Sequence, residues 1–139
     1  MVSDKVRDFV SQNHHAVLTT FRGNGAAQMS IVSVGPYGGG VAFTTTAGRA
    51  KLGNLQRDSR CSLLVSKEDW WGFLVLEGHA RVMSAGNTDA GELSVALRDV
   101  YRAVAGMEHP DWEEYDEAMR RDRRSAVLVV AEHTYGTAM

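Results

Sequence analysis

The sequence predicts a mainly β fold with helices: a small closed or half-closed antiparallel barrel of six strands, formed by one domain over residues 1–139. Three observations predict it. A chain of 139 residues has the length of one domain. Short runs rich in β-branched and aromatic residues are separated by turn residues, without a regular alternation of strands and helices. Gly78 interrupts the longest run, as expected where a barrel strand bends.

The first three strands form a meander. Asn24-Gly25 is a strong signal for a hairpin turn, and "GPYGGG" at residues 35–40 predicts a second turn. The predicted strands span residues 15–21, 28–34, 41–46, 61–66, 72–84 and 126–130, and the last can extend to Tyr135.

Helices are expected at the N-terminus and between the later strands. Ser3 is placed to cap a first helix that ends near Asn13, and residues 47–58 contain a second, short helix. Thr88 is expected to cap a third helix that reaches Gly106. A fourth helix follows Pro110 and is expected to reach Arg124.

Composition limits the kinds of partner. The net charge of -2 gives no general attraction to nucleic acid or to an anionic membrane, and no apolar run is long enough to cross one. The N-terminus does not resemble a signal peptide, so we expect a cytoplasmic protein. A core built from 44% hydrophobic residues does not leave room for a deep cavity as well. A large cofactor would therefore need a second subunit to enclose it.

Charge order and motifs exclude several chemistries. The basic run at residues 120–124 follows an acidic run, which is typical of a solvated helix. The chain has none of the GxSxG, HExxH, CxxC and P-loop motifs. His14 and His15 are adjacent in a strand and point to opposite faces, so we expect no metal site.

Residues 43–65 carry the strongest candidate site. Gly48 allows a close turn before a helix whose first N–H groups are free to meet an anion. Arg49 and Lys51 add two cations there, next to the hydroxyls of Thr44, Thr45 and Thr46. From local physics this is either a phosphate site or a solvated helix start after threonines chosen for strand propensity.

Trp70 and Trp71 form the second unusual feature. Neighbouring residues at a strand entrance face opposite sides, so one ring would enter the core. The other would lie against solvent, a partner or a flat ligand ring. A dimer contact without any ligand remains an equal alternative.

Two motifs carry a family resemblance. The segment "TTTAGRAKLGNLQRDSR" (residues 44–60) and the strand "LEGHARV" (residues 76–82) resemble the split β-barrel superfamily related to pyridoxamine 5′-phosphate oxidase. Within it, the chain is similar to the small branch that uses the deazaflavin coenzyme F-420. The resemblance implies a homodimer with two cofactor sites at the subunit interface. The chain shows no C-terminal substrate segment like that of the true oxidases, so we do not expect it to oxidise pyridoxamine phosphate.

The resemblance also assigns roles to residues. The strand at residues 28–34 would line the cofactor ring, with Ser30 and Val32 in contact, and the tryptophan pair would reach it from the other subunit. Asn54 would fix the loop or a polar tail. The implied cofactor-binding set is Gln28, Ser30, Val32, Thr44, Thr45, Thr46, Arg49, Lys51, Asn54, Trp70 and Trp71.

The function implied is an oxidoreductase that transfers a hydride between coenzyme F-420 and a small conjugated or quinone-like molecule. FMN is the alternative cofactor. A non-catalytic flavin-binding dimer, or a tetrapyrrole-binding one with His79 or His133 as ligand, are further alternatives. Tyr37 and His79 are candidate proton donors, and solvent could serve instead.

Overall fold

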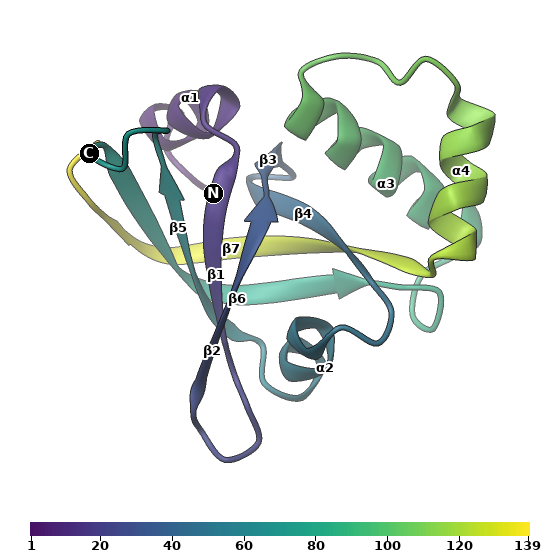
Figure 1. The fold of residues 1–139 in the computed structure, drawn as a ribbon, viewed down its shortest axis with the longest axis horizontal. Helices are drawn as coiled ribbons and strands as arrows, with labels where there is room; N and C mark the ends of the chain where they lie inside the picture. Colours follow the sequence, from purple (N-terminus) through teal and green to yellow (C-terminus); the bar gives the residue numbers. More distant parts are fainter.

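One antiparallel sheet of seven strands organises the chain, and it curls into a half-barrel with β2 and β3 at its two edges (Figure 1). The structure, a computed structural model, describes all residues 1–139. The strand order is β2-β1-β5-β6-β7-β4-β3. The strands are β1 (His15–Phe21), β2 (Ala27–Ser33), β3 (Gly35–Tyr37), β4 (Gly40–Thr46), β5 (Arg60–Ser66), β6 (Phe73–Met83) and β7 (Arg124–Tyr135).

The predicted mainly β class is confirmed, but the count of six strands is wrong by one. The additional strand β3 lies inside the segment predicted as a turn, and it pairs with β4 through Gly35↔Ala42 and Tyr37↔Gly40. Gly38 and Gly39 have φ angles of 57° and 82°, which only glycine adopts readily. They complete a tight turn in two residues, so the residues before them fold back onto β4.

The long sixth strand bends where Gly78 was predicted to bend it. The register between β6 and β7 shifts between Glu77 and Gly78. A Cβ atom on Gly78 would overlap the Val130 carbonyl oxygen of β7. Only glycine allows this close approach, so the bulge at this position is set by the sequence.

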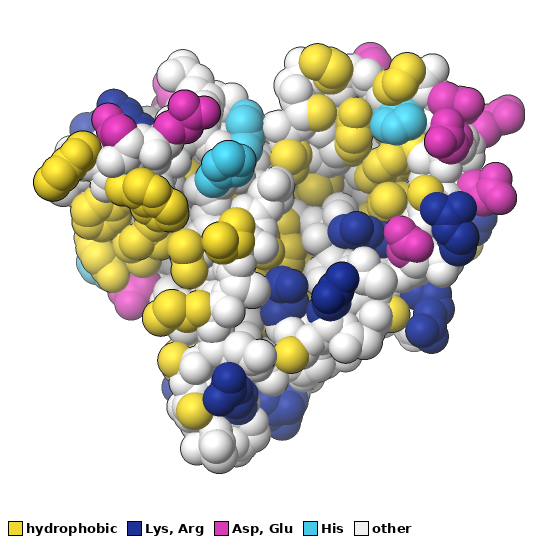
Figure 2. Space-filling view, viewed as in Figure 1, with side chains coloured by type: hydrophobic (Ala, Val, Ile, Leu, Met, Phe, Trp, Pro, Cys, Tyr) yellow, Lys and Arg dark blue, Asp and Glu magenta, His cyan; other side chains and the backbone are white.

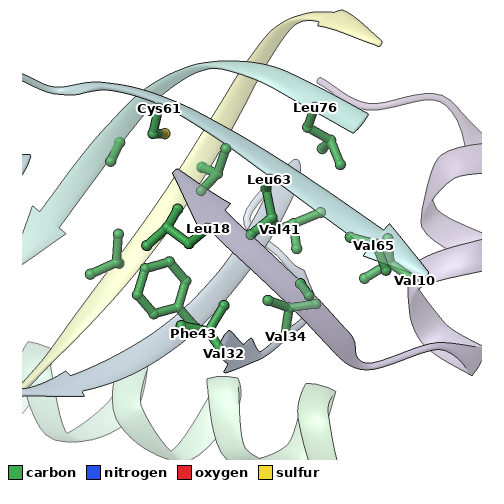
Figure 3. Packing of buried hydrophobic residues seen from close by; sticks show 14 of the residues in the cluster. Val10, Leu18, Val32, Val34, Val41, Phe43, Cys61, Leu63, Val65 and Leu76 are labelled. Carbon is green, nitrogen blue, oxygen red and sulfur yellow. The ribbon is translucent and has the colours of Figure 1, made fainter. Parts of the chain in front are cut away.

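Alternation along the strands produces two cores. Val41 and Phe43 point into the half-barrel (Figure 3), and together with Val127 they belong to the larger cluster of 17 buried residues. Ala42 and Leu128 point to the opposite face and form a second cluster under α3 and α4. The two helices are therefore held against the outside of β4 and β7.

Four helices accompany the sheet: α1 (Asp4–Gln12), α2 (Ala50–Arg57), α3 (Ala90–Ala105) and α4 (Trp112–Arg121). Ser3 caps α1 as predicted, by accepting a hydrogen bond from the Val6 N–H over 3.3 Å. The prediction that Thr88 caps α3 is wrong, because Asp89 is the capping residue and accepts from Gly91 and Glu92. An aspartate oxygen accepts both N–H groups, which stabilises the helix start.

The fourth helix ends three residues earlier than predicted. Arg124 is the first residue of β7 and pairs with Thr46 of β4. Arg98 of α3 binds Asp116 of α4 through its Nε, over 2.9 Å, and fixes the two helices together. None of the four helices combines the length and apolar character needed to cross a membrane.

Candidate functional site

A cavity of about 610 Å³ lies where β2, β4 and β7 meet the helices α3 and α4. Figure 2 shows the molecule hollowed near the middle of one face, with Lys and Arg side chains gathered along the lower side of the hollow. The residues that line the cavity are Ile31, Val32, Ser33, Thr44, Thr45, Thr46, Arg49, Lys51, Val100, Tyr101, Val104, Tyr115, Met119 and Arg124. Its volume falls within the usual range for small-molecule sites.

Three cations converge on this cavity from two separate parts of the chain, and we call it the cationic cavity. Gly48 turns the chain after β4 with a φ of 85°, and Arg49 then precedes the first residue of α2. Lys51 lies in the first turn of that helix. Arg124 arrives from the start of β7, next to the end of β4. The turn and the strand pairing thus bring together charges that are more than 70 residues apart in sequence.

Arg124 is only partly satisfied by the protein. Its Nη1 donates a hydrogen bond to the Thr44 hydroxyl over 3.2 Å. Its Nε is buried and has no hydrogen-bond partner in the structure. A buried donor without a partner carries an energetic cost that a bound anion would remove. The position of Arg124 therefore indicates a site for a negatively charged ligand.

The electrostatics of the cavity also favour an anion. No Asp or Glu lines it, and none of Arg49, Lys51 and Arg124 takes part in an ion pair. The pKa of Lys51 is lowered from its ordinary value, first by burial and then by the nearby charges of Arg49 and Arg124. A phosphate would offset this mutual repulsion. The start of α2 has no side-chain cap, so its first N–H groups are not occupied by a side chain.

The remaining wall is largely apolar and aromatic. Val100, Tyr101 and Val104 come from α3, while Tyr115 and Met119 come from α4. The Tyr115 hydroxyl donates to the Leu97 carbonyl over 2.7 Å, and burial is the main cause that raises its pKa to about 12. Tyr115 is thus a structural phenol, and this wall can accept a flat, apolar ring.

Six of the residues predicted to bind a cofactor line the cavity: Val32, Thr44, Thr45, Thr46, Arg49 and Lys51. Thr44 and Thr46 are half-buried on one face of β4, whereas Thr45 is buried on the other, as the strand alternation predicts. On β2 the wall is formed by Ile31, Val32 and Ser33. The other five predicted residues, Gln28, Ser30, Asn54, Trp70 and Trp71, lie outside its lining.

Asn54 holds α2 against the first hairpin. Its Nδ2 donates to Thr20 Oγ1 over 3.0 Å and to Gln28 Oε1 over 2.8 Å. Its Oδ1 accepts from Arg57, whose Nη2 also donates to the Phe21 carbonyl. The bonds to Thr20, Gln28 and Phe21 join α2 to β1 and β2, so Asn54 fixes the segment that carries Lys51. Its direct contact with a cofactor stays a prediction.

The tryptophan pair lies in the turn between β5 and β6, and the prediction that one ring enters the core is wrong. Trp70 is 61% exposed and Trp71 is 84% exposed. The turn accounts for this, because Trp70 has a φ of 67° and the Lys67 N–H bonds to the Gly72 carbonyl. Both rings therefore project outward, where a second molecule could cover them.

The sequence interpretation missed Arg124, which was assigned to a solvated helix. The available signal was its position directly before the apolar run "SAVLVV", which is a strand. The candidate proton donors Tyr37 and His79 do not line the cavity, while Tyr101 and Tyr115 do. His79 contacts Ser59 over 2.9 Å and Glu132 over 3.0 Å through its two ring nitrogens, away from the cavity.

Solved structures of other proteins share the fold. A conserved hypothetical protein from Mycobacterium tuberculosis aligns with a TM-score of 0.79 at 22% identity, over 98% of this chain and 84% of that chain. A candidate pyridoxamine 5′-phosphate oxidase from Listeria innocua aligns with 0.69 at 14%, over 98% of both chains. An F-420 reductase aligns with 0.66 at 19%, over 96% of this chain and 98% of that chain.

A sequence profile tests membership of a family more directly than these distant structural likenesses. The profile of the pyridoxamine 5′-phosphate oxidase family matches residues 2–137, nearly the whole chain. The match includes both motifs at residues 44–60 and 76–82 and every residue that lines the cationic cavity. The chain therefore belongs to the pyridoxamine 5′-phosphate oxidase family, whose shared fold is the split β-barrel.

Proposed function

We propose that this protein is an oxidoreductase that binds coenzyme F-420 in the cationic cavity and transfers a hydride between it and a small conjugated or quinone-like molecule. The observation that carries the proposal is the convergence of Arg49, Lys51 and Arg124 on one cavity that has no carboxylate in its lining. These charges suit the phosphodiester of the cofactor, and the apolar wall suits its ring.

The chain supplies binding and orientation. Arg49 and Lys51 hold the phosphate, together with the unpartnered Nε of Arg124. Thr44 and Thr46 present hydroxyls from the same face of β4. When bound, a reduced deazaflavin supplies the hydride. Val100, Val104 and Met119 keep water away from that side of the cavity.

A second copy of the chain is expected to complete the site. Ile31 of β2 lines the cavity and is 78% exposed. A second subunit could therefore pack against this wall of the cavity. Trp70 and Trp71 are exposed apolar groups that the partner could contribute. We therefore propose a homodimer with two equivalent cofactor sites.

One observation favours coenzyme F-420 over FMN: the segment at residues 44–60 resembles the deazaflavin-using branch. The shared fold does not separate the two cofactors, since the F-420 reductase aligns with a TM-score of 0.66 and the candidate pyridoxamine 5′-phosphate oxidase with 0.69. FMN remains the alternative cofactor, because its terminal phosphate would fit the same three cations. With either cofactor, the proposed reaction is a redox reaction.

The test is a pair of titrations followed by turnover. The purified protein is titrated with coenzyme F-420 and with FMN by isothermal titration calorimetry. Reduced F-420 is then mixed with menadione, and its oxidation is followed by absorbance against a protein-free control. Tighter binding of F-420 and protein-dependent oxidation support the proposal. Tighter binding of FMN, or binding without turnover, would favour the flavoprotein or the non-catalytic alternative.

A further inference from the structure

A second cavity, of about 580 Å³, lies beside the first. It is formed by α2, by the loop between β6 and α3, and by α3, α4 and the start of β7. Only Met119 and Arg124 line both cavities. Apart from Arg124, none of the cations proposed above to hold the phosphate lines this second cavity, so its function is a separate question.

The floor of the second cavity is apolar. Leu52 of α2, Leu93 and Leu97 of α3, and Met119 of α4 line it. The three leucines are at most 9% exposed, so they form a fixed floor with little freedom to move into the space. An apolar group placed on these leucines would be removed from water, which favours its binding.

The rim of the cavity is cationic. Arg120, Arg123 and Arg124 line it, and none of them takes part in an ion pair. No Asp or Glu contributes to the lining. Basic residues are common at the end of a helix because of its dipole. However, Arg121 lies in the same helix end, does not line the cavity and is near Asp122 at 3.7 Å. The unpaired arginines are thus the ones that face the cavity.

We propose that this second cavity binds a small amphipathic carboxylate, a molecule with an apolar body and one acidic head. The body would lie on Leu52, Leu93 and Leu97, and the head would meet Arg120 and Arg123 at the rim. A highly charged chain such as an oligoglutamate suits this site less, because it would leave the apolar floor uncovered and bury its own charges. The proposal rests on the lining of the cavity and does not depend on the proposed cofactor.

The test uses decanoate as the probe and calorimetry as the readout. Decanoate is titrated into the wild-type protein, with 1-decanol and triglutamate as comparison probes that lack the head or the body. We expect decanoate to bind more tightly than both. Equal or tighter binding of triglutamate would overturn the amphipathic assignment, and the absence of decanoate binding would overturn the site.

Variants then locate the binding. Arg120→Ala with Arg123→Ala removes two exposed charges and should weaken decanoate binding at least ~10-fold, as expected for two charge-assisted contacts. Arg121→Ala is the matched control and should change the affinity less than about twofold. Ala85→Phe places a ring at the cavity from an exposed loop position and should also weaken binding. Unchanged affinity in both cavity variants would contradict the proposal.

A final arm separates this site from the cofactor site. Coenzyme F-420 affinity is measured in the Arg120→Ala/Arg123→Ala variant, since neither arginine lines the first cavity. We expect that affinity to be unchanged while decanoate binding is lost. Loss of both together would show that the two arginines also serve cofactor binding, which would overturn the assignment of a separate second site. Failure of F-420 binding in the wild type would affect only the proposed function.

Discussion

The Nη1 of Arg124 donates a hydrogen bond to the Thr44 hydroxyl over 3.2 Å, from the first residue of β7 to the facing strand β4. This bond aims the guanidinium into the cationic cavity, beside Arg49 and Lys51. It leaves Nε buried without a partner. The pair of strands therefore positions a donor whose unused N–H is available for a ligand, which is what an anion site requires.

Replacing Arg124 tests this interpretation. Arg124→Met keeps much of the side-chain volume but removes the buried, unpartnered Nε, so we expect little or no loss of thermal stability. The affinity for coenzyme F-420 should fall roughly 10- to 100-fold, as one charge-assisted bond is lost. Thermal melts and calorimetric titration measure the two effects. Arg121→Met is the control, and a variant with normal affinity but lower stability would indicate a purely structural Arg124.

Binding should depend on pH through Lys51. The pKa of Lys51 is lowered, mainly by burial and also by Arg49 and Arg124. As the pH rises, the ammonium group therefore loses its proton before the pH reaches the ordinary pKa of 10.5. Cofactor affinity should therefore decrease as the pH rises through the lowered pKa. Between that pKa and 10.5 the unfolded chain binds more protons, so the stability of the free protein should rise with pH.

The control for this pH dependence is Lys51→Arg, which keeps a positive charge throughout the same range. Affinity is measured by fluorescence titration at a series of pH values for both proteins. The difference between the two curves isolates Lys51 from the titration of the cofactor itself. Curves that stay parallel at alkaline pH would show that Lys51 does not contact the anion.

Asn54 is expected to contribute to stability. Asn54 is 6% exposed. Asn54→Ala removes its hydrogen bonds to Thr20 and Gln28, and it removes the oxygen that accepts a hydrogen bond from Arg57. The free energy of unfolding should fall by about 1–3 kcal/mol, because buried partners lose their hydrogen bonds. Urea denaturation measures it. The exposed Gln56→Ala in the same helix should change little, and an equal effect in both variants would remove the special role of Asn54.

The exposed tryptophans predict a dimer contact. We expect the wild type to sediment as a dimer at micromolar concentration, and Trp70→Ser with Trp71→Ser to raise the dissociation constant at least ~10-fold. The variant should keep its fold, because the two rings are 61% and 84% exposed and lie outside both cores. Val95→Ser, at another exposed apolar position, is the control. An unchanged dissociation constant in the double variant would place the interface elsewhere.

Local signals allowed most of the fold to be predicted. Gly78 marked the bulge of β6, and Asn24-Gly25 marked the hairpin between β1 and β2. Strand β3 was missed because three residues give almost no periodic pattern, and its pairing depends on the tight turn at Gly38 and Gly39. Short segments that fold back through glycines are set by tertiary pairing more than by their own propensity.

The site could be predicted only where it is local in sequence. Arg49 and Lys51 follow Thr44 and Thr46 directly, so the motif itself indicated an anion site. Arg124 is 80 residues from the threonine that it contacts, and only the pairing of β4 with β7 brings them together. Its charge looked like part of a solvated helix because Arg120 and Arg121, just before it in the sequence, are the last residues of α4.

The most direct test of the central claim is the affinity of the protein for coenzyme F-420 with and without the two cations of the motif. Calorimetric titration compares the wild type, Arg49→Ala with Lys51→Ala, and a control, Lys5→Ala with Arg81→Ala, that removes the same charge from exposed positions outside the cavity. We predict that the cavity variant loses roughly 2–4 kcal/mol of binding free energy, because two charge-assisted phosphate bonds are lost, and that the control binds like the wild type. Equal affinity in all three proteins would contradict the assignment of this cavity as the phosphate site.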